Sequence, residues 1–217
     1  MNTKFILGIV VGAALALGGT WAYKSYCSAC WSEADSANQQ AQIGKPAPDF
    51  TLMNQYGQEV ALSQVNQKGP IVLEWFNKDC PYVKKFYDAG EMQRLQNAYG
   101  GQGFQWLRIV SSAPGKQGHL NREQAKASHK KSKADHTLMD PTGEVGRSYG
   151  AKTTPHVFVI DEDGMLVYAG AVDSIRSTDS ADIKKAESYL VAALEAVQND
   201  TPLETSSTEP YGCSVKY

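Results

Sequence analysis

The sequence lacks an excess of charge of either sign and is poor in cysteine. Its 21 Lys and Arg residues nearly balance 23 Asp and Glu residues, so the net charge is only −2. A chain so close to neutrality has no overall field that would hold a polyanion, which argues against nucleic-acid binding. Four cysteines are too few for a small scaffold held together by disulfides.

The sequence does contain enough apolar residues for one core. Of its 217 residues, 42% are hydrophobic and 10% are aromatic. This composition excludes a fully disordered chain, and the length allows one domain of ordinary size with appendages. We expect that domain over residues 43–199, followed by a polar C-terminal tail over residues 200–217.

An uncharged apolar run precedes the domain. Residues 5–23 carry no charged side chain and follow Lys4. At about 1.5 Å per residue, a helix of this length would just span a bilayer core. The run is either a signal-anchor retained in the membrane or a signal peptide cleaved after Ala22. Both interpretations predict a periplasmic domain, which residues 24–42 tether to the inner membrane unless the signal is cleaved.

Apolar strands alternate with helices along the expected domain. We expect a hairpin over 52–62, strands over 71–76, 104–110, 157–160 and 166–169, and helices over 81–99, 121–135 and 183–197, the first of them kinked at Gly90. Such alternation, followed by a late hairpin and a closing helix, is typical of an α/β fold. It predicts a central mixed β-sheet flanked by helices.

Cys80 lies at the predicted junction of a strand and a helix, directly before Pro81. Proline suits the first helical position, and its ring keeps the preceding residue in the extended conformation of an N-cap. The free amide groups of Tyr82 and Val83 would then point toward the Cys80 sulfur at the positive end of the helix dipole. Such an environment favours the thiolate, which predicts a nucleophilic cysteine rather than a small buried residue.

Several segments resemble the thioredoxin-like superfamily, and in particular its peroxiredoxin-like subgroup of alkyl hydroperoxide reductases and thiol-specific antioxidants. Residues 44–52 are similar to the entry hairpin of these proteins, and Cys80 stands where thioredoxins carry the first cysteine of C-x-x-C. Residues 152–161 resemble the segment that carries their cis-proline. The resemblance implies a thioredoxin-like fold over about residues 43–197 and thiol-based redox chemistry without an organic cofactor.

The chain departs from both family patterns around Cys80. Val83 replaces the second cysteine of C-x-x-C, so the helix holds no resolving thiol. In the peroxiredoxin pattern P-x-x-x-T-x-x-C, Leu73 replaces the proline and Asn77 the threonine that helps to seat a peroxide. Asn77 remains a candidate substrate-binding residue in place of that hydroxyl. Thiol–disulfide exchange and hydroperoxide reduction both remain open.

The resemblance implies roles for two further positions. Glu74 lies six residues before Cys80, where thioredoxins carry a buried acid that relays a proton to the resolving thiol. Burial would raise the pKa of this carboxyl, whereas an end-of-strand glutamate would simply face water. Thr154 and Pro155, if joined by a cis bond, would offer a backbone edge on which an extended substrate pairs. Otherwise Pro155 only begins a strand.

The other three cysteines lie outside the expected domain. Cys213 is placed in a flexible tail 133 positions after Cys80 and is the candidate resolving thiol; it is otherwise a surface thiol or an intermolecular link. Closure entropy grows only slowly with loop length, so this separation does not prevent pairing. Cys27 and Cys30 form a C-x-x-C pair in the tether, suited to a disulfide, a thiol relay or acylation.

These observations predict an extracytoplasmic thiol-dependent redox protein that uses Cys80 as its nucleophile. Its partners would be protein thiols and disulfides or a hydroperoxide, an external reductant, and the membrane. The alternative is a thioredoxin-fold copper-binding chaperone, with Cys80 and His156 as ligands, or a tethered scaffold without turnover. The remaining histidines, His119, His129 and His136, lie among lysines and are typical of a solvated basic face rather than a metal site.

Overall fold

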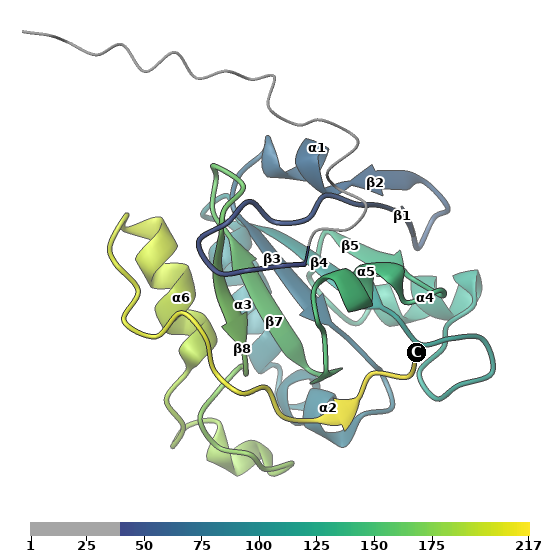
Figure 1. The fold of residues 1–217 in the computed structure, drawn as a ribbon. Helices are drawn as coiled ribbons and strands as arrows, with labels where there is room; N and C mark the ends of the chain where they lie inside the picture. Colours follow the sequence, from purple (N-terminus) through teal and green to yellow (C-terminus); the bar gives the residue numbers. More distant parts are fainter. Residues whose placement is uncertain (1–39) are drawn as a thin grey trace, which may run out of the picture. The chain divides into compact units, whose positions relative to one another are not determined.

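The computed structural model describes residues 40–217 and forms an α/β fold with a mixed seven-stranded sheet. The strand order is β2-β1-β5-β4-β3-β7-β8, with β3, β4 and β5 parallel and the other pairs antiparallel (Figure 1). The strands of this sheet are β1 Thr51–Asn54, β2 Glu59–Ala61, β3 Ile71–Trp75, β4 Gln105–Val110, β5 His136–Met139, β7 His156–Ile160 and β8 Leu166–Gly170. The expected central mixed sheet is therefore present.

Helices cover both faces of the sheet. They are α1 Leu62–Asn66, α2 Pro81–Asp88, α3 Glu91–Gly100, α4 Arg122–His129, α5 Glu144–Ser148 and α6 Tyr189–Gln198. Residues of α2, α3 and α6 pack against one face, and residues of α1 and α5 pack against the other. The central strand β3 is buried at every position because helices cover it on both sides, which explains its nearly continuous apolar sequence.

Several predicted boundaries were wrong for local reasons. The helix expected over 81–99 is two helices, because Gly90 adopts a left-handed conformation with φ 73° and separates α2 from α3. The last helix begins only after Ser188, whose side chain accepts a hydrogen bond from the amide of Val191. The helix expected over 121–135 ends at His129. Strand β5 and helix α5 were not predicted.

The C-terminal residues are not the free tail that their polarity suggested. Two short strands, β6 Thr153–Thr154 and β9 Cys213–Ser214, pair antiparallel as a separate small sheet. Figure 1 shows this segment (yellow) running from α6 past the ends of β8 and β7. Hydrogen bonds on either side of β9, such as that from the hydroxyl of Tyr217 to the carbonyl oxygen of Ala151 at 2.7 Å, hold the segment on the domain.

The predicted N-terminal elements lie outside the described residues. These are the apolar run 5–23 and most of the tether, including Cys27 and Cys30. Within residues 40–217, no helix combines the length and the apolar character needed to cross a bilayer.

Candidate active site

Cys80 lies where the sequence predicted, between β3 and α2. It is the N-cap of α2 with φ −73° and ψ 123°, and Pro81 opens the helix. Its side chain is fully buried, with 0% of its surface exposed, among apolar residues that the sequence did not identify as its neighbours. This apolar cluster contains Phe76, Val83, Val110, Leu120 and Ala125.

The loop before β7 brings a polar group to the sulfur. The Thr154–Pro155 peptide bond is cis, and the carbonyl oxygen of Thr154 accepts a hydrogen bond from Cys80 Sγ at 2.9 Å. Cys80 and this loop are 74 residues apart in the sequence. They meet because β3 and β7 are adjacent antiparallel strands, with Trp75 opposite His156.

The C-terminal segment brings Cys213 to the same place. Cys213 lies directly opposite Thr154 in the β6–β9 pair, and the Thr154 hydroxyl donates to the Cys213 carbonyl oxygen at 3.4 Å. The Cys213 side chain packs against the cluster of buried residues that contains Cys80, and both cysteines are free. Cys80 is buried whereas Cys213 is only partly so, which makes Cys213 the more accessible of the two thiols.

Gly212 allows this close approach. Its φ is 148°, and a Cβ atom at this position would overlap the carbonyl oxygen of Thr154. Only glycine combines that backbone conformation with so close a contact. Glycine is therefore required at position 212 for β9 to pair with β6.

The two thiols have pKa values displaced in opposite directions. Burial raises the Cys80 pKa, but hydrogen bonding by Cys213, through its thiol and its amide, together with smaller contributions from Thr154 and the Val83 amide, outweighs burial, so that the net displacement is downward. The Thr154 carbonyl acts against this, since it accepts only from the protonated thiol. Burial, the hydrogen bond with Cys80 and its charge raise the pKa of Cys213 to about 11.

The predicted helix N-terminal effect on the thiol is present in part. The Val83 amide lowers the pKa of Cys80, although the sulfur makes no full capping hydrogen bond. The amide of Cys213 contributes as well, and it comes from a segment that local sequence patterns could not place near the helix. The environment of the sulfur is therefore formed by three segments rather than by one helix end.

Glu74 is buried on the sheet face that packs against α2 and α3, and it does not face water. Its Oε2 accepts hydrogen bonds from the Tyr87 hydroxyl and from Trp106 Nε1, both at 2.9 Å. Burial raises its pKa, and Arg108 opposes this displacement. Among residues 40–217, Oε1 has no hydrogen-bond partner. No hydrogen bond within that same range joins Glu74 to the predicted resolving thiol of Cys213 or to Cys80.

Asn77 is used within its own loop. Its Oδ1 accepts from the amide of Asp79 at 2.9 Å, and its Nδ2 donates to the Gln117 carbonyl oxygen at 3.4 Å. The side chain also packs closely against Gly118, where a Cβ atom would overlap it. The residue therefore joins two loops beside Cys80, and both polar ends of its amide are engaged there.

The histidine proposed for copper binding points elsewhere. The ring of His156 packs on Phe158, with centroids 4.3 Å apart, and its Nδ1 accepts from the amide of Lys152 at 3.3 Å. Burial and the charge of Lys152 lower its pKa to about 3. In the described part of the chain, no three His, Cys, Asp or Glu side chains come together in a group that could hold a metal ion.

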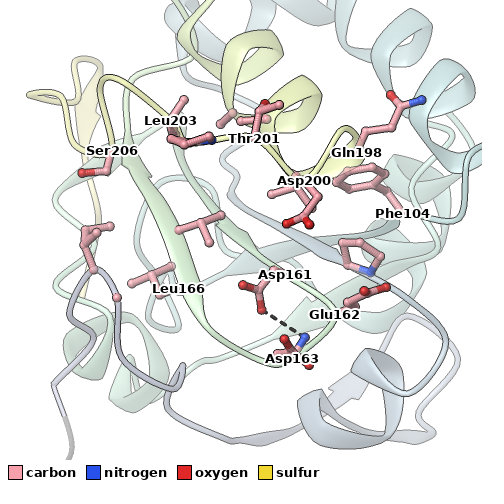
Figure 2. Close-up of a pocket in the computed structure, with 18 of the residues that line it drawn as sticks. Phe104, Asp161, Glu162, Asp163, Leu166, Gln198, Asp200, Thr201, Leu203 and Ser206 are labelled. Atoms are coloured by element: carbon pink, nitrogen blue, oxygen red, sulfur yellow. Dashed lines mark hydrogen bonds between the residues drawn. The ribbon is translucent and has the colours of Figure 1, made fainter. Parts of the chain in front are cut away.

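A cavity in the described part of the chain lies far from the two thiols. This groove of about 720 Å³ is lined by Pro70 and Phe104, which precede β3 and β4, and by the turn after β7 (Figure 2). Cys80 follows the opposite end of β3, so the groove lies at the other end of the sheet. Its lining includes Leu166 and Leu203 and the acidic residues Asp161 and Asp200.

Sequence reasoning missed the residues that secure the C-terminal segment. Lys85, Asp173 and Tyr211 form a buried polar network close to both thiols. The local sequence contains no signal for this network, because Lys85 lies on α2 about 160° around the helix axis from Val83, outside the apolar face of Val83 and Phe86.

Comparison with protein families gives one match over most of the chain. The model of the Redoxin family matches residues 42–190. No curated protein matches the sequence. The family match includes Cys80 and the cis-Pro155 loop but ends before Cys213.

Solved structures show similar folds. A hypothetical protein from Sinorhizobium meliloti 1021 is 25% identical, with a TM-score of 0.68 over 82% of this chain and 96% of its own. An uncharacterized conserved protein from Geobacillus kaustophilus is 28% identical, with a TM-score of 0.68 over 81% of this chain and 92% of its own. The peroxidoxin BcpB of Mycobacterium tuberculosis is 23% identical, with a TM-score of 0.53 over 73% of this chain and 99% of its own, and shows the fold alone.

Proposed function

The chain belongs to the Redoxin family of thioredoxin-fold oxidoreductases, and from this premise we propose that Cys80 and Cys213 form a redox-active pair that catalyses thiol–disulfide exchange. The observation that carries the proposal is that both cysteines lie at the Thr154–Pro155 loop: Cys80 Sγ donates to the Thr154 carbonyl oxygen, and Cys213 pairs with Thr154 and packs against the cluster that contains Cys80. The proposed compartment is extracytoplasmic, because the apolar run 5–23 has the features of an export signal or anchor. Disulfides persist in such a compartment.

The first step uses Cys80 as the nucleophile. Its thiolate attacks one sulfur of a substrate disulfide and expels the other as a thiolate, which leaves a mixed disulfide between Cys80 and the substrate. The lowered pKa of Cys80 increases the fraction of thiolate available for this attack. In this proposal, Thr154 and Pro155 line the approach to the sulfur.

Cys213 resolves the mixed disulfide. Its thiolate attacks Cys80 Sγ, the second substrate thiolate leaves, and the Cys80–Cys213 disulfide forms. Two of the causes that raise the pKa of Cys213 are the hydrogen bond with Cys80 and the Cys80 charge. Both causes disappear when Cys80 is in a mixed disulfide, so Cys213 loses its proton more readily at the step that needs it. An external dithiol then reduces the disulfide and returns both thiols.

A test of the pair uses the full chain and two variants, in each of which one of the two cysteines is replaced by serine. The wild type is equilibrated with a small disulfide, quenched by alkylation and analysed by peptide mass spectrometry. We expect a peptide that links Cys80 to Cys213, and we expect Cys80→Ser and Cys213→Ser to give mixed disulfides with the reagent instead. If Cys80 and Cys213 of the wild type are both still free to be alkylated after treatment with the disulfide, the proposal is contradicted.

One observation favours hydroperoxide reduction as a second candidate. The Cys80 side chain is fully buried, and β9 covers the edge beside it, so a small oxidant reaches the sulfur more easily than a folded protein does. Here the Cys80 thiolate would take the distal oxygen of the peroxide, an alcohol or water would leave, and Cys213 would condense with the sulfenic acid to release water.

Stopped-flow oxidation distinguishes the two reactions. The reduced wild type and Cys80→Ser are mixed with hydrogen peroxide and, separately, with a small disulfide. Faster peroxide consumption by the wild type than by the variant supports peroxide reduction. Equally slow consumption by both proteins removes that candidate and leaves thiol–disulfide exchange.

A further inference from the structure

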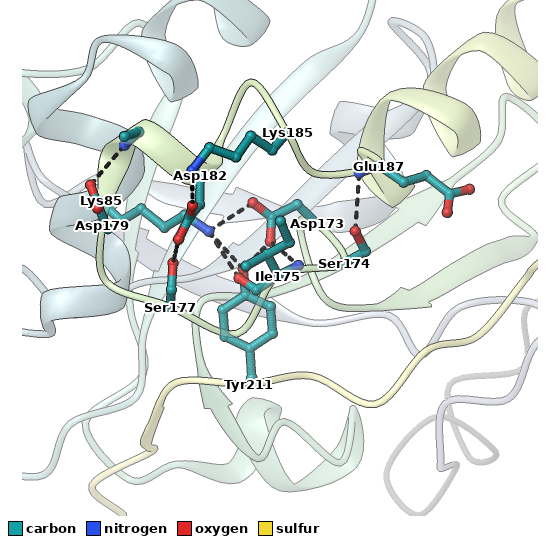
Figure 3. A network of polar contacts seen from close by, with 11 residues as sticks. Lys85, Asp173, Ser174, Ile175, Ser177, Asp179, Asp182, Lys185, Glu187 and Tyr211 are labelled. Atoms are coloured by element: carbon teal, nitrogen blue, oxygen red, sulfur yellow. Dashed lines mark hydrogen bonds and ion pairs between the residues drawn. The ribbon is translucent and has the colours of Figure 1, made fainter.

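A buried ion pair lies beneath the C-terminal segment (Figure 3). Lys85 Nζ on α2 is 2.8 Å from Asp173 Oδ2, and the side chains of Lys85 and Asp173 are 0% and 4% exposed. Lys85 Nζ also donates to the carbonyl oxygen of Ile175 at 3.0 Å and to the hydroxyl of Tyr211 at 3.3 Å. The same Tyr211 hydroxyl donates to Asp173 Oδ1.

This network satisfies each charged group that it buries. Asp173 accepts hydrogen bonds from Lys85, from Tyr211 and from the amide of Ile175, the last at 3.1 Å. Such pairs are weak sources of stability, because removing two charges from water offsets most of their attraction. A well-packed apolar cluster of the same volume would stabilise the fold about as well. What the network adds is a fixed orientation of the groups it joins.

The groups that it joins belong to the two segments that carry the thiols. Lys85 is five residues after Cys80 on the helix that Cys80 caps, and Tyr211 is two residues before Cys213. The ring of Tyr211 also packs edge-on against Tyr82, with centroids 5.7 Å apart, two residues after Cys80. Asp173 and Ile175, after β8, supply the third fixed segment. One buried centre thus links both thiol-bearing segments.

We infer that Lys85, Asp173 and Tyr211 are positioning residues that hold the Cys213 sulfur against Cys80. The inference rests on the proposed redox pair. None of the three touches either sulfur; each acts through the backbone that carries Cys80 or Cys213. Their effect is to raise the effective concentration of one thiol at the other, which otherwise depends on closing a loop of more than a hundred residues.

The test is Tyr211→Phe, which removes the hydroxyl and keeps the ring. We expect the equilibrium constant for the Cys80–Cys213 disulfide, measured against glutathione buffers, to fall roughly tenfold, as for the loss of one hydrogen bond to a charged group. Tyr149→Phe is the matched control, because the hydroxyl of that buried tyrosine donates to the Pro48 carbonyl oxygen at 2.7 Å, outside the network of Lys85, Asp173 and Tyr211. It should leave the constant unchanged.

A second readout separates positioning from a purely structural role. The Cys213 thiol and amide both lower the pKa of Cys80, so loosening β9 in Tyr211→Phe should move the pH profile of Cys80 alkylation upward. Asp173→Asn should shift both measurements in the same direction. A disulfide that forms in the wild type and is equally stable in Tyr211→Phe overturns the inference, whereas a wild type that forms no disulfide contradicts the proposed pair itself.

Discussion

Two carboxylates are buried close to helix α2, and they are held in different ways. Asp173 has hydrogen-bond partners for both oxygens, including a lysine, and its network reaches the segment of Cys213. Glu74 has partners for one oxygen only within residues 40–217, and these partners lead to Tyr87 and Trp106 rather than to a thiol. The carboxylate at the spacing of the family is therefore not the one that is linked to the reactive cysteines. For these two carboxylates, the hydrogen-bond partners in the structure indicate a role at the thiols better than the distance from Cys80 along the sequence does.

The largest expected effect is on stability when the ion pair at Asp173 is broken. Asp173→Ala leaves the Lys85 ammonium buried without a counterion, so we expect the free energy of unfolding to fall by roughly 3–5 kcal/mol. Urea denaturation followed by tryptophan fluorescence measures the change. Glu123→Ala is the control, because it removes an exposed pair with Lys126 and should leave the denaturation midpoint close to that of the wild type. Similar denaturation midpoints for both variants would show that the buried pair contributes no more to the free energy of unfolding than an exposed pair does.

The next effect concerns the backbone that carries Cys213. In Gly212→Ala the new Cβ overlaps the Thr154 carbonyl oxygen, so β9 must move away from β6. We expect the rate of Cys80–Cys213 disulfide formation to fall at least about tenfold, the factor that corresponds to roughly 1.4 kcal/mol of lost positioning. Quenched alkylation after mixing with a small disulfide measures this rate.

Gly100→Ala is the matched control for that substitution. Gly100 ends α3, its φ is not in the positive range, and a Cβ atom there meets no other atom within 4 Å. The same added methyl group should therefore leave disulfide formation unchanged. Equal rates in the two variants would mean that β9 does not present Cys213 to Cys80.

Glu74 gives a smaller effect whose sign depends on pH. Its folded-state pKa is raised by burial, so the folded protein binds this proton more tightly than the unfolded chain does. The contribution of Glu74 to stability is therefore fully present below the unfolded value of about 4.5 and is lost as pH rises through the folded-state pKa. Glu74→Gln should remove this dependence and be relatively more stable at the upper end of the window.

Urea denaturation of the wild type and Glu74→Gln between pH 4 and pH 8 measures this difference. The same variant tests the proton relay predicted from the sequence. Because no hydrogen bond in the described part of the chain joins Glu74 to Cys213 or to Cys80, we expect disulfide formation to slow by less than about threefold, well below the general acid–base range. A hundredfold slower rate of disulfide formation in Glu74→Gln would instead support the proton relay.

Local signals in the sequence predicted much of the fold and one half of the candidate site. The apolar run of β3 and the Cys80-Pro81 junction depend on residues adjacent in the chain, so their conformation was predictable. The position of Cys213 was not, because β9 has two residues, too few for any periodic pattern, and depends on Tyr211 and Gly212 meeting partners far away in the sequence. The same reason explains why Lys85 was overlooked.

The smallest expected effect compares the two thiols themselves. The Cys213 side chain is the largest of the hydrogen-bonding causes that lower the Cys80 pKa, and burial opposes them all. Cys213→Ala removes this hydrogen bond but keeps the backbone amides, so the alkylation midpoint of Cys80 should rise and its alkylation rate at pH 7 should fall. Ser214→Ala serves as the control, because it removes an exposed hydroxyl from the same strand, and the hydrogen bond of that hydroxyl is with Lys216. If the midpoint stays fixed in Cys213→Ala, the low pKa of Cys80 belongs to the helix end and its amides, and Cys213 then contributes to the site only as the second thiol.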